Sequence, residues 1–190
     1  MQAACSIKQT EMESRRRMFE RLPAFLKAGV YYTTKLEAVR LQSYYPRLFA
    51  FQLVMKEANQ QYFTGNHSSA CRKYEEAYSM WRYFKSSNPK WNTEGIDDTQ
   101  LTEEEWKGKD EQENEWIRQH KLLSLQNILA CLLKEENYVD ALPVADEVLR
   151  LDPDNKTGLF RRAKAVSKPV NASVEDYEQA IADLKKINSQ

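Results

Sequence analysis

Histidine and cysteine, the side chains that most often act in catalysis and metal binding, are few and far apart in this chain. The histidines are His67 and His120, and the cysteines are Cys5, Cys71 and Cys131. None of them is spaced as in a Cys-x-x-Cys motif or a zinc site. Cys71 and Cys131 fall within helical patterns, so we expect small core residues there. We expect both histidines to be ordinary surface or turn residues.

Carboxylates are concentrated between residues 97 and 115, but they form a charge run and define no acid/base pair. The chain has no glycine-rich phosphate loop and no nucleophile with a placed histidine. We therefore predict that the protein is not an enzyme and that it uses no metal and no cofactor. No apolar run approaches the ~18 residues that a membrane span needs, so we predict no span.

The charge is balanced over the whole chain and uneven along it. Lys+Arg and Asp+Glu number 28 each, which gives no reason to expect a nucleic-acid partner. Residues 1–90 carry 15 basic and 7 acidic side chains, whereas residues 91–117 carry 2 and 10. The basic first part and the acidic middle are therefore expected to attract each other, within one chain or between chains.

Two groups of side chains are candidates for contacts with a partner. Arg15, Arg16 and Arg17 are consecutive; they would suit a polyanionic or acidic partner, or they form a solvated helix face. Trp91 and Trp106 lie in an otherwise hydrophilic segment. Two tryptophans there would either dock back on the helices or anchor a partner.

Apolar periodicity predicts an all-α fold. Across residues 118–165, leucines recur at three- and four-residue steps, a short charged turn interrupts them, and a second periodic run ends at Pro153. Five glycines and six prolines in 190 residues also argue against a turn-rich sheet protein. Further helices are expected at 11–28 (with a kink or split at Pro23 and an end at Gly29), 33–45, 46–64, 68–87 and 174–187. The acidic residues 86–112 read as a long insertion with a short helix at 103–107.

Three segments carry a resemblance to a known family. They are KEANQQYFTGNHSSACRKYEEA at 56–77, NILACLLKEENYVDAL at 127–142 and GLFRRAKA at 158–165. They resemble the tetratricopeptide-repeat proteins, and in particular the three-repeat domain of the large immunophilin and aryl-receptor-interacting-protein co-chaperones. That family also has an acidic interruption between its first two repeats. We expect no counterpart of the isomerase domain that precedes the repeats in immunophilins, because residues 1–46 are too short and too helical to form one.

The resemblance implies three helical hairpins in a right-handed solenoid, preceded by extra N-terminal helices. We expect an N-terminal helical extension at 1–46 and a repeat domain at 47–188. Within that domain we expect repeat 1 at 47–85, the acidic insertion at 86–112, repeat 2 at 113–152 and repeat 3 at 155–188. The concave surface made by the first helix of each hairpin is the usual peptide groove of such a solenoid.

The resemblance also implies a peptide-binding site. Relatives that bind the ninety-kilodalton heat-shock chaperone hold an acidic C-terminal tail in a carboxylate clamp of two Lys, two Asn and one Arg. Asn59, Asn127 and Arg161 match the two Asn and the Arg. Met55 and Thr157 occupy the two Lys positions, and Lys56 and Lys156 lie one residue away. Because one residue turns a side chain by about 100° on a helix, the clamp is altered.

Two functions remain open. The first is a non-catalytic scaffold subunit of a larger assembly, which could be cytoskeletal, axonemal or organellar. Three features favour it: the unmatched lysines, the basic N-terminus and an apolar C-terminal end (Ile181, Leu184 and Ile187). We expect another chain to cover that apolar end. The second is a cytosolic co-chaperone adaptor that binds an acidic chaperone tail through the partial clamp. We expect a cytoplasmic, cytoskeletal or ciliary protein, with an organelle still open.

Overall fold

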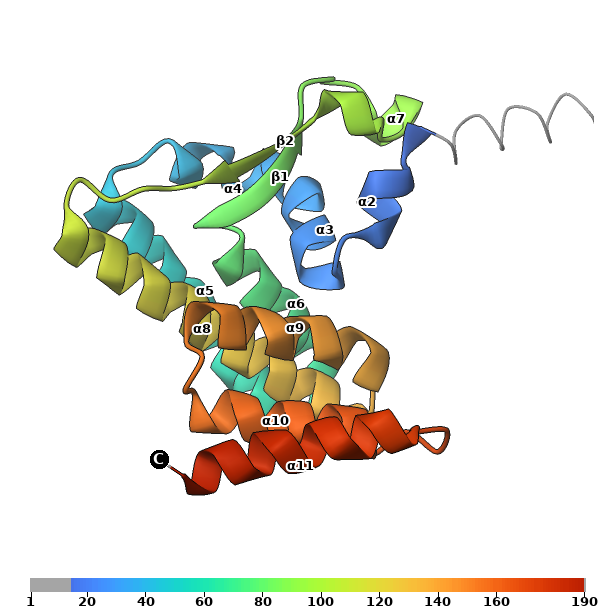
Figure 1. Ribbon diagram of the computed structural model, residues 1–190. Helices are drawn as coiled ribbons and strands as arrows, with labels where there is room; N and C mark the ends of the chain where they lie inside the picture. The colour runs from blue at the N-terminus through green and yellow to red at the C-terminus, as the bar shows by residue number, and fades with distance from the viewer. Residues whose placement is uncertain (1–14, 190) are drawn as a thin grey trace, which may run out of the picture.

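The computed structural model describes residues 15–189, so Cys5 and the start of the expected 11–28 helix lie outside it. The described chain is mostly helical, with one small two-stranded sheet (Figure 1). Its α-helices are α2 (Arg17–Arg21), α3 (Ala24–Tyr31), α4 (Thr33–Arg40), α5 (Tyr44–Phe63), α6 (His67–Tyr78), α7 (Trp91–Glu94), α8 (Glu111–Lys134), α9 (Tyr138–Leu151), α10 (Lys156–Ser167) and α11 (Val174–Asn188). The strands are β1 (Arg82–Ser86) and β2 (Leu101–Glu105), and a 3-10 turn, η1 (Asp98–Gln100), leads into β2.

Six of the helices form three stacked hairpins. The pairs are α5 with α6, α8 with α9 and α10 with α11; α8 packs on α6 and α10 packs on α9 (Figure 1). Ala58, Ala70 and Ala141 are fully buried, and such small side chains let two helices approach closely. The predicted fold class, three hairpins with extra N-terminal helices, is confirmed.

Local sequence explains where these helices begin and end. Gly65, two residues after the end of α5 at Phe63, has φ +80°, a left-handed conformation that glycine adopts without steric cost. The side chains of Asp110, Asn155 and Ser173 accept backbone N–H bonds at the starts of α8, α10 and α11. These caps satisfy donors that the first helical turn would otherwise leave without partners.

The N-terminal helical region differs from its prediction at Gly29. Pro23 does split the expected helix, since α2 ends at Arg21 and α3 begins at Ala24. Gly29, however, lies inside α3 and does not end it. A Cβ atom at Gly29 would lie 2.8 Å from Cβ of Tyr83, so glycine is needed there for the close approach of α3 to β1.

The acidic insertion is also more ordered than predicted. The expected helix at 68–87 is wrong beyond Tyr78, because residues 82–86 form β1; the expected helix at 103–107 is wrong because residues 101–105 form β2. The strands pair antiparallel, with Arg82 opposite Glu105 and Ser86 opposite Leu101. The run of glutamates on β2 faces basic side chains of β1, and opposite charges across a sheet stabilise the pairing.

Two buried arginines, Arg40 of α4 and Arg47 of α5, contact the chain in β1 or just before it. Arg40 donates from Nη2 to the carbonyl oxygen of Gly29 at 3.0 Å, and its guanidinium lies 3.5 Å from the ring centroid of Tyr83. Arg47 is 1% exposed, and its Nη1 donates to the carbonyl oxygen of Met80 at 2.6 Å. Burial lowers the pKa of each guanidinium to about 10. Since both groups remain charged at neutral pH, they satisfy backbone carbonyls in the interior.

Candidate functional site

The candidate site is the surface formed by the exposed sides of α5, α8 and α10, the first helix of each hairpin; we call it the A-helix face. Contacts between α5 and α8 set which residues lie at the same level of this face. Ser124 Oγ lies 4.0 Å from Met55 Sδ. Asn59 and Asn127 each lie about one turn further along their helices, so the structure brings these two predicted residues to the same level.

The two asparagines have unused hydrogen-bonding capacity. The amide oxygen of Asn59 accepts a hydrogen bond from the hydroxyl of Tyr74 at 2.6 Å. Within residues 15–189, the Asn59 NH2 group has no partner, and neither does the half-buried side chain of Asn127. Both amides can therefore donate to a ligand without adding a desolvated charge.

Arg161 joins these residues from the third hairpin. Its Nη1 donates to the carbonyl oxygen of Gln126 on α8. The amide of Gln126 donates in turn to Oδ1 of Asn155, the N-cap of α10, at 3.1 Å. Burial lowers the pKa of Arg161 from its ordinary value, but arginine stays protonated. The packing of α8 against α10 therefore positions a half-buried cation at Gln126, the residue before Asn127.

The two lysine positions of the clamp are filled differently. Met55 is buried against α8, whereas Thr157 is exposed at the second residue of α10. Lys56 and Lys156 are both exposed, and in the described part of the chain neither forms an ion pair. The structure therefore leaves both lysines available to solvent, one residue away from the positions that the resemblance requires.

Two further lysines, absent from the sequence prediction, line one hollow together with Arg161. A hollow of about 140 Å³ on the A-helix face is lined by Tyr62, Ala130, Leu133, Lys134, Phe160, Arg161 and Lys164. We call it the basic hollow, since three of these described residues are basic and none is acidic. Periodicity could have found both lysines: Lys134 follows Asn127 by seven residues and Lys164 follows Arg161 by three, spacings that share one helical face.

The cations of the basic hollow form no ion pair within the described residues. Over residues 15–189, neither Lys134 nor Lys164 has an ion-pair partner, and Arg161 contacts a carbonyl oxygen only. Three cations around one concavity create a positive potential there. An anionic group of a ligand, above all a carboxylate, would form charge-assisted hydrogen bonds in it.

The two candidate tryptophans pack on the protein's own helices. The Trp91 ring lies 5.7 Å from that of Tyr31, edge to face. Trp106 stacks on Tyr44 at 6.2 Å, and its backbone N–H donates to the carbonyl oxygen of Trp81 at 2.8 Å. Both tryptophans are half-buried. That a partner contacts the exposed parts of these two tryptophans stays a prediction.

His120 belongs to the same aromatic cluster, and the expectation of a surface or turn position is wrong for it. Its ring lies 5.0 Å from Phe51 and 5.3 Å from Trp81, and its Nε2 is 3.0 Å from the Tyr44 hydroxyl. Burial lowers the pKa of the imidazole. The cluster fixes the N-terminal half of α8 against α5 and thereby supports the part of the A-helix face that these two segments form.

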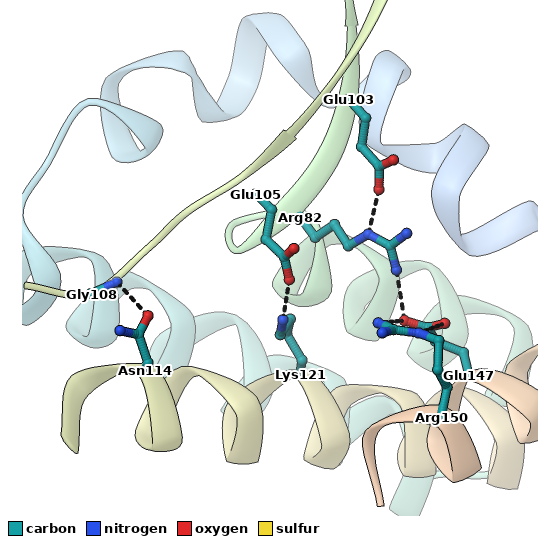
Figure 2. Close-up of polar contacts among 8 residues, drawn as sticks. All are labelled: Arg82, Glu103, Glu105, Gly108, Asn114, Lys121, Glu147 and Arg150. Atoms are coloured by element: carbon teal, nitrogen blue, oxygen red, sulfur yellow. Dashed lines mark hydrogen bonds and ion pairs between the residues drawn. The ribbon is translucent and has the colours of Figure 1, made fainter. Parts of the chain in front are cut away.

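The sheet is held to α8 and α9 by ion pairs (Figure 2). Arg82 of β1 contacts Glu103 of β2 at 2.5 Å and Glu147 of α9 at 2.6 Å, and Glu105 accepts from Lys121 of α8. The predicted attraction between the basic first part of the chain and its acidic middle therefore occurs within one chain.

The three candidate arginines lie elsewhere. Figure 1 shows α2 beside α7, away from α10 and α11. Arg15 and Arg17 are exposed, and Arg16 pairs with Glu20 at 2.8 Å. The structure therefore does not bring them to the A-helix face, and any contact of theirs would be a separate one.

The described residues were also compared with the requirements of a metal site, a reactive cysteine and a membrane span. Between residues 15 and 189, no group of three His, Cys, Asp or Glu side chains is arranged to hold a metal ion. Cys71 and Cys131 are buried free thiols, and burial raises the pKa of Cys131 to about 12. That range contains no helix that combines the length and apolar character of a membrane span.

Comparisons with known proteins point the same way as the geometry. No family model matches the chain. The chain is 28% identical over 143 residues to aryl-hydrocarbon-interacting protein-like 1 of Mus musculus. These residues are 74% of this chain and 36% of the relative. For the protein of the same name in Pan paniscus, identity is 24% over 147 residues, which are 76% of this chain and 32% of the relative.

A shorter match comes from a second kind of protein. The DnaJ homolog subfamily C member 3 of Rattus norvegicus is 33% identical over 66 residues, which are 34% of this chain and 13% of the relative. The chain thus spans about a third or less of the length of the curated relatives it matches. With its stacked hairpins, the chain forms a helical array of the tetratricopeptide-repeat type, and it is distantly similar to the aryl-hydrocarbon-interacting protein-like 1 proteins.

Proposed function

We propose that this protein is a non-catalytic adaptor of the co-chaperone type, whose A-helix face binds the acidic C-terminal tail of a protein partner. One observation carries the proposal: Arg161, Lys134 and Lys164 line the basic hollow, and no acidic side chain among residues 15–189 lines it with them. Asn59 and Asn127 lie at one level of the same A-helix face. The similarity to a DnaJ homolog and to the aryl-hydrocarbon-interacting-protein-like proteins supports it as well. We propose the cytoplasm as its compartment.

The chemistry of the face suits a terminal carboxylate. The free NH2 groups of Asn59 and Asn127 would donate to one carboxylate, and Arg161 would form a charge-assisted hydrogen bond to it or to a preceding acidic side chain. Lys134 and Lys164 would attract the remaining negative charge. Such a ligand would neutralise cations that the described chain leaves without ion-pair partners.

The test is calorimetry with a synthetic peptide that ends in Glu-Glu-Ala-Asp and a free carboxylate. Binding should weaken as salt is added, because exposed charges are screened. Arg161→Ala should weaken binding by about ten- to a hundredfold, the range for a hydrogen bond to a charged group. The matched control is Lys90→Ala, which removes an exposed charge outside the A-helix face.

Two results would contradict the proposal. One is the absence of any binding by the folded wild-type protein. The other is binding that Arg161→Ala leaves unchanged, or that persists at full strength when the terminal carboxylate of the peptide is amidated.

We propose a subunit of a larger assembly, cytoskeletal or ciliary, as the second candidate function, on a specific observation at α11. Tyr74 and Val148 occupy corresponding places in the first two hairpins and are 2% and 0% exposed, whereas Leu184 in the third is 41% exposed. Val174, Tyr177 and Ile181 extend this apolar strip along α11 and are exposed as well. An amphipathic helix of a partner protein would cover the strip as α8 covers α6.

Light scattering and dye binding test this second candidate. An isolated chain that is monomeric, stable and unable to bind an apolar dye would contradict it. Tyr177→Ser with Leu184→Ser should reduce dye binding without a loss of helicity, since both side chains are at least two-fifths exposed.

A further inference from the structure

The last helix, α11, carries exposed apolar side chains at the spacing of a helix–helix interface. We call them the α11 strip. They are between 41% and 70% exposed, and they follow one another at steps of three, four and three residues, as the a and d positions of paired helices do. They are Val174, Tyr177, Ile181 and Leu184. Ala180 and Asp183, in contrast, are buried against α10. One side of α11 therefore packs on its own hairpin, and the strip is left for another helix.

A hollow lies at one end of the strip. Its volume is about 360 Å³, and residues of both α10 and α11 line it. Phe160, Ala163, Ala180 and Leu184 are its apolar lining residues, and Phe160 is 57% exposed. A helix that packs on the strip would place an apolar side chain in this hollow. The shape of the surface therefore suits a helix as well as its spacing does.

The charges of α11 are divided between its two halves. Residues 174–181 carry three acidic side chains and no basic one. Residues 182–188 carry two lysines, and their one acidic side chain, Asp183, is 3% exposed. Within residues 15–189, Glu175, Glu178 and Lys185 form no ion pair. These three charges are therefore available to a helix that packs on the strip.

We propose that the α11 strip pairs with the same strip of a second copy of this chain, with the two helices antiparallel. This arrangement sets the acidic half of each helix against the basic half of the other, whereas a parallel pair would set like charges together. It also brings Val174 to the level of Leu184 of the second copy. The proposal rests on the second candidate function and deepens it, because it identifies the helix that covers the strip.

Symmetry and size set the kind of association. The same patch is used on both copies, so the contact closes at a dimer. The strip offers four apolar side chains along about 15 Å of helix, far fewer than the roughly 20–30 residues that each partner brings to a standard interface. Interfaces of standard size begin at about micromolar affinity. Dimerisation should therefore be reversible and should appear at micromolar or higher concentrations of the chain.

Sedimentation velocity of the whole chain over this concentration range tests the pairing. The wild type should pass from monomer to dimer and form no larger species. Ile181→Ser should weaken dimerisation by about a hundredfold, because the dimer buries this side chain twice. Since Ile181 is 51% exposed in the single chain, the variant should keep its helicity. Val139→Ser, at an 85% exposed residue of α9, is the matched control and should not alter dimerisation.

Charge reversal tests the antiparallel arrangement. Glu175→Lys with Glu178→Lys makes the acidic half of α11 net positive, and Lys185→Glu removes the net positive charge exposed on the other half. Each of these two variants alone should dimerise about tenfold more weakly, because like charges then face each other twice. An equimolar mixture of the two should recover the affinity of the wild type, since opposite charges face each other again. Circular dichroism shows that each variant is folded.

Each other outcome is decisive. A wild-type chain that stays monomeric but binds an apolar dye would overturn the pairing and leave the strip to a different protein. A monomer that binds no dye would overturn both the pairing and the second candidate function. Dimerisation that survives Ile181→Ser would overturn the role of the strip, and tighter dimerisation of Glu175→Lys with Glu178→Lys would overturn the antiparallel arrangement. Arg161→Ala should leave dimerisation unchanged; its loss would assign the contact to the A-helix face.

Discussion

The hydroxyl of Tyr74 donates to the amide oxygen of Asn59 at 2.6 Å. Tyr74 is buried on α6, the second helix of its hairpin, and Asn59 is exposed on α5, the first. Burial raises the pKa of Tyr74 to about 12, so its hydroxyl remains a donor at all physiological pH values. A core residue thus sets which end of the Asn59 amide is left for a ligand.

Tyr74→Phe tests this relationship. The variant keeps the buried ring and frees the amide of Asn59 to rotate, so affinity for the acidic peptide should fall by about two- to fivefold, with a loss of stability of about 1 kcal/mol. Calorimetry and thermal unfolding would measure the two effects. Tyr138→Phe removes the hydroxyl of a half-buried tyrosine on α9 and should change neither. An unchanged affinity in Tyr74→Phe would show that Asn59 needs no such positioning.

The lysine positions of the clamp make a second prediction. Thr157 is exposed and lies four residues before Arg161, on the same side of α10. Thr157→Lys should therefore tighten binding of the acidic peptide by about three- to tenfold through one more charge-assisted contact. Met55→Lys should instead destabilise the fold by about 2–4 kcal/mol, because it buries an unpaired charge. Peptide titration would measure the affinity of each variant, and urea unfolding would measure its stability. Equal effects of the two substitutions would contradict the finding that Met55 is buried and Thr157 is exposed.

A third prediction concerns pH. Burial raises the pKa of Glu75 on α6 to about 7, and the negative charge of Asp140 adds to the shift. The folded state therefore holds the carboxyl proton of Glu75 more tightly than the unfolded chain does. The stability that this protonation contributes is complete below the ordinary carboxyl pKa and is lost as the pH rises through about 7.

Glu75→Gln should remove this dependence. Relative to the wild type, the variant should gain about 1–3 kcal/mol in the free energy of unfolding between pH 5 and pH 8. Denaturant melts at several pH values would measure it, with the exposed Glu178→Gln as the control. Parallel stability curves for wild type and Glu75→Gln would exclude Glu75 as the titrating group.

A fourth prediction concerns the contact between the acidic segment and the N-terminal helices. Asp98 accepts backbone N–H bonds from Met18 at 2.6 Å and Phe19 at 3.0 Å, at the start of α2. Asp98→Ala should cost about 1–2 kcal/mol, as the loss of a helix cap does, and should speed amide exchange in α2. Glu37→Ala, an exposed acidic residue on α4, should have no such effect. Unaltered exchange in Asp98→Ala would contradict the capping role.

Most helices of this protein could be predicted from its sequence, because their signals are local. The apolar period of α8 and α9, the stop at Pro153 and the turn glycine at Gly65 each act within a few residues. Asn59, Asn127 and Arg161 could be named through the family resemblance, and the structure places them on one face. Lys134 and Lys164 were missed because no motif marks them, although their helical spacing from Asn127 and Arg161 was visible.

Only the tertiary structure decided the rest, because it depends on contacts between distant segments. Residues 101–105 carry three glutamates and have weak strand propensity; they become a strand because residues 82–86 offer basic partners about twenty residues earlier. Gly29 is set by the approach of Tyr83, and the basic hollow exists because α10 stacks beside α8. Sequence alone determined the repeats and their helices, through local periodicity, prolines and caps. The grouping of Asn59, Asn127 and Arg161 on the A-helix face came from the packing of α5, α8 and α10 against one another, which local signals do not encode.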